Sequence, residues 1–258
     1  MYLCIIKLNI IERKKFTKQE ELNIINLHKQ GNSPTKIATL FNTYNTSIRR
    51  VLLRNNIKLK NNSESKVSIK ENPFINYETD EKAAYWLGYL IADGSISSGK
   101  GGYRVIINTN KDPEHLQKYA EWIGKSIHKY WNKTYNVWEY SVVFYNKAIV
   151  EWFISIGVTP KKSLTLKLKI KMNSHILRGV FDGDGYLNKW SANITSGSFL
   201  FITSLEQYYI KNELSPSIVV DKRGNRCYTI CAKNLVNWNT LIYKNATIFL
   251  ERKFGAVR

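Results

Sequence analysis

Cysteine is scarce in this sequence of 258 residues. The three copies, Cys4, Cys227 and Cys231, cannot all pair with one another, and they do not combine with histidine at zinc-site spacing. These features argue against a disulfide framework and against a zinc site. We therefore expect structural thiols in a reducing intracellular compartment, and not a secreted protein.

Long hydrophobic runs are also absent. Residues 1–10 are apolar, but the stretch is short, charged residues follow at 12–15, and it lacks a basic leader and a small-residue cleavage site. From this we expect no signal peptide, no membrane span and no membrane partner. Hydrophobic residues still make up 43% of the chain, which is enough to fill the cores of a folded protein.

Acidic residues are few. The chain has 20 Asp and Glu against 39 Lys and Arg, which gives a formal net charge of +19. This charge exceeds what solubility needs and predicts a polyanionic partner, with nucleic acid ahead of an anionic membrane surface. An AT-rich gene, which favours Lys, Asn and Ile, is the alternative origin, and the charge would then be a solvated surface.

Residues 1–60 have the pattern of a small helical domain. Helical periodicity covers residues 18–30, 34–41 and 45–55, and only a tight turn precedes the third segment. This arrangement is typical of a helix-turn-helix, whose last helix enters the major groove of DNA. The side chains expected to reach bases and phosphates are Asn45, Thr46, Ser47, Arg49 and Arg50. A three-helix packing module without DNA contact is the alternative.

Residues 61–77 lose apolar periodicity and are predicted to be a linker. Beyond them the sequence predicts an α+β region in which one order of helices and strands occurs twice, in residues 78–162 and 163–258. The expected helices cover residues 80–92, 113–127, 146–156, 173–183, 199–213 and 234–249. The expected strands lie at residues 103–108, within 137–145, at 186, and at 192–195, 217–221 and 227–232.

The first helix of each half carries the same motif. The first copy is Trp-Leu-Gly-Tyr-Leu-Ile-Ala-Asp-Gly at residues 86–94, and the second is Leu-Arg-Gly-Val-Phe-Asp-Gly-Asp-Gly at residues 177–185. In both, a glycine and a second small residue lie one turn apart on one helical face, which a facing helix can approach closely. The residues expected at this contact are Gly88, Ala92, Gly179 and Gly183.

Such packing would bring Asp93 and Asp184 close together at the helix C-termini. Two carboxylates there repel each other and face the negative ends of both helix dipoles, unless a cation lies between them. Oxygen ligands favour Mg²⁺ or another hard divalent ion, such as Mn²⁺ or Ca²⁺, which can activate water and neutralise charge on a phosphate. The pair therefore predicts a metal site.

With two such motifs and a shared downstream pattern, the chain from about residue 78 onward resembles the monomeric LAGLIDADG homing endonucleases. The resemblance implies a pseudo-twofold pair of αββαββα halves that forms a saddle over double-stranded DNA. It also implies that Asp93 and Asp184 are catalytic metal ligands, assisted by the carbonyl groups of Ala92 and Gly183.

The two halves also resemble the family at their ends. The family often places an active-site lysine after the last helix of each half, which implies Lys162 and Lys253, and each lies 69 residues after its motif aspartate. A lysine near a cleaved phosphate can polarise water or stabilise the developing charge. Plain phosphate contact is the alternative. The first motif has Ile91 where the second has Asp182, a position that the resemblance does not make catalytic.

Strand residues that alternate outward from the helices are candidates to contact DNA. They are Arg104, Asn108, Asn110, Tyr140, Asn193, Thr195, Ser196, Arg223 and Arg226. By the resemblance, Asn110 and Ser196 also lie where polar groups order active-site water. The sequence does not set the strand register, so a plain surface role is the alternative for each residue.

These features together predict a site-specific homing endonuclease, a monomer that makes a metal-dependent staggered cut in a long DNA target, one strand per aspartate. An intron RNA maturase and a DNA-binding transcriptional regulator on the same fold are the alternatives. A regulator would be expected to have lost one or both acids, whereas both remain. The Cys or Ser start and the His-Asn end that intein splicing needs are lacking, so self-splicing is not expected.

Overall fold

The computed structural model describes residues 15–57, 59, 68–99, 102–221 and 227–254. The chain divides into two compact units, residues 1–65 and 66–258. No helix within the described ranges has both the length and the apolar character needed to cross a membrane.

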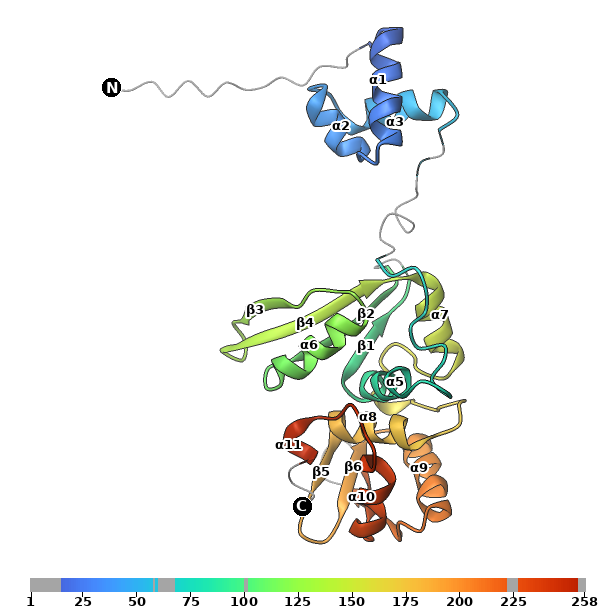
Figure 1. Cartoon of the computed structure of the whole chain (residues 1–258), viewed down its shortest axis with the longest axis vertical. Helices are drawn as coiled ribbons and strands as arrows, with labels where there is room; N and C mark the ends of the chain where they lie inside the picture. The colour runs from blue at the N-terminus through green and yellow to red at the C-terminus, as the bar shows by residue number, and fades with distance from the viewer. Residues whose placement is uncertain (1–14, 58, 60–67, 100–101, 222–226, 255–258) are drawn as a thin grey trace, which may run out of the picture. The chain divides into compact units, whose positions relative to one another are not determined.

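The first unit consists of three helices, α1 (Lys18–Lys29), α2 (Pro34–Leu40) and α3 (Asn45–Arg54) (Figure 1). Helix α1 begins with a capping box between Thr17 and Glu20, and the Ser33 side chain caps α2. Apolar side chains from all three helices form a separate core of Ile24, Ile37, Ala38, Ile48, Val51 and Leu52. The three helices that the sequence predicts are therefore present.

The second unit contains two sets of elements in the same order. The first set is α5 (Glu81–Asp93), β1 (Gly94–Ser97), β2 (Arg104–Thr109), α6 (Pro113–Trp122), β3 (His128–Asn132), β4 (Val137–Tyr145) and α7 (Lys147–Ser155). The second set is α8 (Ser174–Asp184), β5 (Gly185–Leu187), β6 (Ala192–Ser196), α9 (Phe199–Lys211), β7 (Pro216–Asp221), β8 (Cys227–Ala232) and α10 (Leu235–Tyr243). A 3-10 turn, η1 (Lys162–Leu164), follows the first set, and a short helix, α11 (Glu251–Phe254), follows the second. The predicted α+β pair of αββαββα halves is confirmed.

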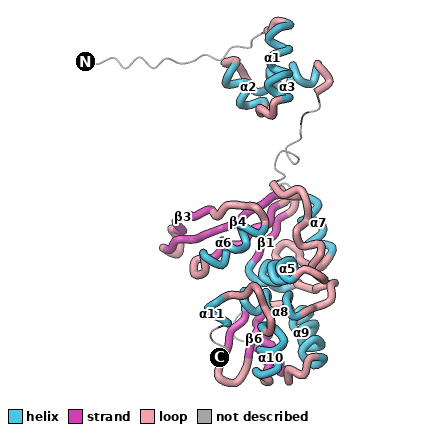
Figure 2. Tube along the Cα trace, viewed as in Figure 1, coloured by secondary structure: helices cyan, strands magenta, loops and turns pink. Residues whose placement is uncertain are grey.

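Each half has one antiparallel sheet of four strands. The strand orders are β1-β2-β4-β3 and β5-β6-β8-β7, so the two sheets have equivalent topologies. Figures 1 and 2 show the two sheets on either side of the paired helices α5 and α8. The pseudo-twofold repeat that the sequence indicates is therefore also a repeat in space.

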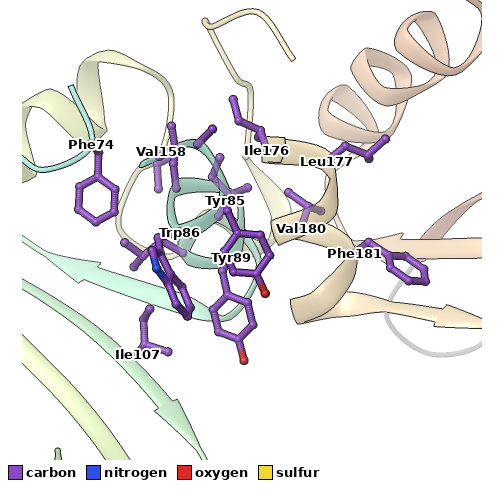
Figure 3. Close-up of a cluster of buried hydrophobic side chains, with 14 of the residues drawn as sticks. Phe74, Tyr85, Trp86, Tyr89, Ile107, Val158, Ile176, Leu177, Val180 and Phe181 are labelled. Carbon is purple, nitrogen blue, oxygen red and sulfur yellow. The ribbon is translucent and has the colours of Figure 1, made fainter. Parts of the chain in front are cut away.

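Helices α5 and α8 pack through their glycines. A methyl group added at Gly88 would lie 2.1 Å from the carbonyl oxygen of Ile176, and one added at Gly179 would lie 2.0 Å from that of Tyr85. At such distances the backbone leaves no space for a side chain. Apolar side chains from both helices surround the contact (Figure 3).

Part of the predicted linker, residues 68–77, belongs to the second unit. Phe74 is fully buried, with its ring against those of Trp122 and Phe153. The backbone N–H of Ser68 donates to the carbonyl oxygen of Tyr145, and Ser68 Oγ accepts from the backbone N–H of Tyr145, both at 2.9 Å. This segment has no regular periodicity, yet Phe74 is part of the core and Ile69 and Tyr77 pack against that core.

Strands β1 and β3 were not predicted from the sequence. The helix expected over residues 113–127 ends at Trp122, and the chain then forms β3, which pairs with β4 from His128 opposite Ser141 to Asn132 opposite Val137. Most side chains of β3 are exposed, so no buried stripe marks it in the sequence. Strand β3 is thus defined by its pairing and not by a hydrophobic pattern.

The last predicted helix is broken. It ends at Tyr243 instead of continuing to residue 249. The buried Arg178 side chain donates to the carbonyl oxygens of Ile242 at 2.7 Å and Ile248 at 2.8 Å. These bonds to a side chain from α8 replace helical hydrogen bonds, because a buried arginine needs several acceptors.

Candidate active site

Both motif helices end at an aspartate, Asp93 in α5 and Asp184 in α8. The Asp93 carboxyl carbon lies 3.4 Å from the position that a methyl group on Gly183 would occupy, and Gly183 directly precedes Asp184. Both aspartate side chains are exposed to solvent. The helix packing therefore places two neighbouring carboxylates at one end of the interface between the halves.

The surroundings raise the pKa of both carboxyl groups. The pKa of Asp184 is raised to about 6, mainly because the carboxyl group loses hydration in the fold and also because the charge of Asp93 lies nearby. Loss of hydration also raises the pKa of Asp93, although a hydrogen bond from Tyr89 and the charges of Lys253 and Lys162 oppose this rise. Because both groups resist ionisation at this position, a bound cation would stabilise their charged forms.

Lys162 lies at the C-terminal end of α5. Its Nζ donates to the carbonyl oxygens of Gly94 at 2.7 Å and Ala92 at 3.1 Å. Burial lowers the pKa of Lys162, while the charges of Asp184 and Asp93 oppose this effect. The ammonium group therefore lies where the helix dipole and both carboxylates favour positive charge.

Lys253 takes the equivalent place in the second half. Its Nζ donates to the carbonyl oxygens of Phe181 at 2.7 Å and Gly183 at 3.2 Å. The side chain is buried, and burial lowers its pKa to about 8. The carbonyl groups predicted to assist a metal, those of Ala92 and Gly183, therefore each accept a lysine hydrogen bond, and each retains a second lone pair.

A cavity of about 240 Å³ opens beside Asp184 and Lys162. Its other lining residues are Ile91, Ala92, Ser163, Leu166, Thr195, Ser196, Gly197, Phe201 and Cys227. Thr195 and Ser196 thus share this cavity with the acid and the lysine. Asn110 instead lines a separate cavity of about 390 Å³, together with Asn108.

A buried polar cluster that was not predicted from the sequence lies next to the second motif aspartate. Asp182 is fully buried and accepts hydrogen bonds from the hydroxyl groups of Tyr85 at 2.8 Å and Tyr243 at 3.1 Å, and from the backbone N–H of Leu250 at 2.7 Å. Burial raises the pKa of Asp182 to about 6. The signal in the sequence was the inequality of the two motifs, which have Ile91 and Asp182 at equivalent positions.

A second contact between the halves is the ion pair of Arg178 on α8 with Glu81 on α5. This side chain is 1% exposed and donates to the carboxylate of Glu81, the first residue of α5. Glu81 also accepts from the backbone N–H of Thr247 at 2.9 Å and from its hydroxyl at 2.7 Å. Burial alone would raise the pKa of Glu81. The hydrogen bonds from Thr247 and the charge of Arg178 outweigh this effect, so the pKa is lowered.

In the first sheet, Arg104 and Asn108 lie on the face that turns away from the helices. Val105 and Ile107 alternate with them and are buried, so the two polar side chains are exposed on the opposite face. Tyr140 does not share this face, because the register places it on the helix side, where it packs against the core. This placement removes Tyr140 from the predicted base-contacting residues.

Asn193 is also removed from that set, because its side chain is only 1% exposed. Its amide group donates to the carbonyl oxygens of Ser191 at 3.0 Å and Tyr186 at 3.4 Å, and its oxygen accepts from Ser191 Oγ at 3.0 Å. These bonds satisfy the side chain inside the β5–β6 hairpin. A residue that is held in this way has no free group to present to a base.

Four candidates from the second half remain. Thr195 and Ser196 are half-buried, and the Thr195 hydroxyl lies 2.7 Å from that of Thr229. Arg223 and Arg226 lie outside the described residues.

On α3 of the first unit, most predicted contact residues are accessible. Thr46 and Arg50 are exposed, and Ser47 and Arg49 are half-buried. None of the four belongs to the apolar core of this unit. Asn45 differs, because its side chain donates to Thr35 Oγ1 at 2.7 Å and so ties α3 to α2. Asn45 therefore contributes to the arrangement of the two helices.

Residues 80–154 match the family model of the LAGLIDADG-like domain. The uncharacterized protein MJ0314 of Methanocaldococcus jannaschii is 29% identical over 209 residues, which are 80% of this chain and 66% of that protein, slightly under two thirds of its length.

Among solved structures, mesophilic variants of the homing endonuclease I-DmoI align with a TM-score of 0.52 at 15% identity, over 72% of this chain and 98% of theirs. The homing endonuclease I-WcaI bound to its DNA recognition sequence aligns with a TM-score of 0.49 at 14% identity, over 78% of this chain and 96% of its own. The likeness to I-DmoI establishes a common fold.

Proposed function

Because the chain carries a LAGLIDADG-like domain and has the two-domain LAGLIDADG fold, we propose that it is a site-specific homing endonuclease. It cuts both strands of duplex DNA in a metal-dependent reaction, with a stagger between the cuts and one aspartate for each strand. The observation that carries this proposal is the pair of Asp93 and Asp184 at the ends of the packed motif helices, each with a lysine beside it.

The donor set at this site fits a hard divalent cation. Among the described residues, no cluster of three or more His, Cys, Asp or Glu side chains could hold a metal ion, so the side-chain ligands would be the two carboxylates, with the carbonyl groups of Ala92 and Gly183 beside them. Mg²⁺ is commonly held by one or two carboxylates while water and substrate phosphate complete its shell. Asp93 and Asp184 would therefore hold the ion. When bound, it supplies activation of water and neutralises charge on the cleaved phosphate.

The two lysines support a reaction on an anionic substrate. Lys162 and Lys253 keep their ammonium groups next to the carboxylates, at the ends of α5 and α8. A positive charge fixed at this place stabilises the negative charge that develops on a phosphate in the transition state. Ser196, in the cavity beside Asp184, supplies a hydroxyl group that can order a water molecule.

Binding of long duplex DNA by a monomer is supported by charge and by exposed polar side chains. The net charge of +19 favours contact with phosphates along an extended site. Arg104 and Asn108 are exposed on the outer face of the first sheet, where they can reach base edges. The three-helix unit adds a second contact, which raises the affinity through effective concentration and takes no part in the chemistry.

The test is cleavage of a plasmid library that carries candidate insertion sites. The protein is incubated with Mg²⁺ or with EDTA, and the ends of linear products are sequenced to locate both cuts. Wild type is compared with Asp93→Asn and Asp184→Asn, which keep the side-chain shape and remove the charge. Glu151→Gln serves as the control, because Glu151 lies in an exposed ion pair with Lys147 on α7.

The proposal requires Mg²⁺-dependent linear products with wild type and with the control, and nicked or uncut plasmid with each aspartate variant. Absence of cleavage by all four proteins, with duplex DNA still bound, would favour the transcriptional regulator. Preferential binding of structured RNA over duplex DNA in a competition assay, again without cleavage, would favour the maturase.

A further inference from the structure

Asp112 is the residue that precedes helix α6, and it does not cap that helix. An aspartate at this position ordinarily accepts hydrogen bonds from the first backbone N–H groups of its helix, but the Asp112 side chain makes no such bond. Its two carboxylate oxygens instead accept from Arg252, Oδ1 from Nε at 2.9 Å and Oδ2 from Nη2 at 3.0 Å. The Asp112 carboxylate of the first half is therefore paired with the C-terminal segment of the second half.

Arg252 directly precedes Lys253 on α11. This helix has only four residues, so its own hydrogen bonds cannot fix its position. Its place depends on tertiary contacts, and two of them come from the first half: the pair of Arg252 with Asp112, and the pair of Glu251 with Lys118 at 3.4 Å. A bidentate arginine–carboxylate pair fixes orientation as well as distance.

In the second half, the residue at the equivalent position contacts the segment that carries the lysine of the first half. Ser198 precedes helix α9 as Asp112 precedes α6, since each follows the second strand of its half. Ser198 is buried and, unlike Asp112, caps its helix by accepting from the backbone N–H of Phe201 at 3.4 Å, while its Oγ donates to the carbonyl oxygen of Leu166 at 2.7 Å. The backbone N–H of Leu166 donates in turn to the carbonyl oxygen of Lys162 at 2.9 Å. The segment that carries Lys162 is therefore held by the second half.

The neighbouring residue, Gly197, also lies close to the segment that carries Lys162. A methyl group on Gly197 would lie 2.8 Å from the carbonyl oxygen of Ser163, the residue after Lys162. The two halves thus use different chemistry, an ion pair in one and a hydroxyl–carbonyl bond in the other, at the same position of the fold. In both halves, the residue before this helix therefore contacts the segment beside the lysine of the other half.

We infer that Asp112 and Ser198 are positioning residues, and that each half of the protein places the lysine of the other half. Asp112 places Lys253 through Arg252, and Ser198 places Lys162 through the backbone at Leu166. The role of the lysines in DNA cleavage rests on the proposed function, whereas the way they are held does not. Each lysine donates to carbonyl groups of its own half, and the contact with the other half adds a second constraint on its position.

The experiment measures the accessibility of each lysine without DNA. The full chain is treated briefly with acetic anhydride at pH 8, and acetylation of every lysine is quantified by peptide mass spectrometry. The variants are Asp112→Ser, which keeps a side chain able to cap α6, and Ser198→Ala. Glu151→Gln is again the control, because it removes an exposed ion pair on α7 that involves neither lysine.

We expect Asp112→Ser to raise acetylation of Lys253 several-fold and to leave Lys162 unchanged, and Ser198→Ala to do the reverse. The double variant Asp112→Arg with Arg252→Asp restores the ion pair with reversed charges and should return Lys253 to low acetylation. Thermal melting of each variant identifies loss of fold, in which every lysine would become reactive together.

Equal acetylation of Lys253 in wild type and Asp112→Ser, with both proteins folded, would overturn the inference. So would a rise at Lys253 that the charge-reversed pair fails to correct. Because this readout needs no cleavage, failure of the proposed nuclease activity leaves it intact. If the nuclease is active, Asp112→Ser should also accumulate plasmid nicked in one strand, and Ser198→Ala plasmid nicked in the other.

Discussion

Gly179 faces the carbonyl oxygen of Tyr85 so closely that an added methyl group would lie 2.0 Å from that oxygen. Real side chains do not approach a backbone oxygen to this distance, so Gly179→Ala must push α5 and α8 apart. We expect a loss of about 3 kcal/mol in the free energy of unfolding of the second unit, measured by urea denaturation. Lys82→Ala, at an exposed position of α5, is the control and should change stability by less than about 0.5 kcal/mol. A fully stable Gly179→Ala protein would contradict the close contact.

The segment before α5 should behave as core. Phe74→Ala removes a fully buried ring, and we expect a loss of about 3 to 5 kcal/mol in the free energy of unfolding. The neighbouring side chain of Ile75 is 55% exposed, so Ile75→Ala should change stability by less than about 0.5 kcal/mol. Chemical denaturation followed by tryptophan fluorescence measures both, since the Phe74 ring contacts Trp122. Equal, small effects of the two substitutions would show that residues 68–77 are a linker after all.

Without divalent ions, Asp184→Asn should stabilise the protein at neutral pH. The folded-state pKa of Asp184, about 6, lies above its ordinary value of 3.8, so the folded chain holds the proton more tightly than the unfolded chain does. Stability therefore falls as pH rises from about 4 to about 6, and the penalty is complete above that range. Because the side chain is exposed, solvent screening reduces the gain at pH 7.5 to about 1 kcal/mol. Thermal melting at pH 4 and pH 7.5 checks this, and the gain should vanish at pH 4.

Divalent cations should reverse that effect in the wild-type protein. Mg²⁺ binds the ionised carboxylates and competes with protons, so its affinity should rise as pH increases through about 6, the pKa of Asp184. We expect millimolar Mg²⁺ to raise the melting temperature of the wild type at pH 7.5, and EDTA to remove the gain. The double variant Asp93→Asn with Asp184→Asn should not respond. The same Mg²⁺-dependent shift in both proteins would place the ion elsewhere.

The first unit should contribute phosphate contacts through α3. Replacing Arg49 and Arg50 together by glutamine should weaken binding to duplex DNA and reduce the dependence of log affinity on log salt by up to about 2. Arg54→Gln on the same helix is the matched control, because Arg54 is paired with Glu21. Fluorescence anisotropy with a labelled duplex over a range of salt gives the slopes. Equal slopes for the wild type and the double variant would indicate a packing role for this unit.

Several features of the site follow from the sequence alone because they depend on local periodicity. A glycine and a small residue one turn apart on each of two helices predict that those helices pack closely, and an aspartate at the same place in each motif then brings two carboxylates together. The three helices of the first unit follow in the same way from capping residues and helical spacing. Each of these patterns lies within a few helical turns of one segment, so it can be recognised without knowing the fold.

Other features depend on strand register and on burial, which the sequence leaves open. Alternation alone places polar strand residues on one of two faces, and a shift of one residue exchanges the faces. Arg104 and Asn108 are exposed, whereas Asn193 is enclosed and Tyr140 packs beside the core. Burial of Phe74 likewise depends on rings from two helices that follow much later in the chain.

The paired motif helices, the repeat of the two halves and the residues that meet at their helix ends could thus be predicted from local patterns in the sequence. The side chains that hold this site in place became apparent from the folded structure. Asp182 meets Tyr85 and Leu250, and Asp112 meets Arg252 across 140 residues of chain. The physical reason is that a helix or strand pattern records which face of a segment is apolar, whereas a contact between distant polar groups depends on where the whole backbone brings them.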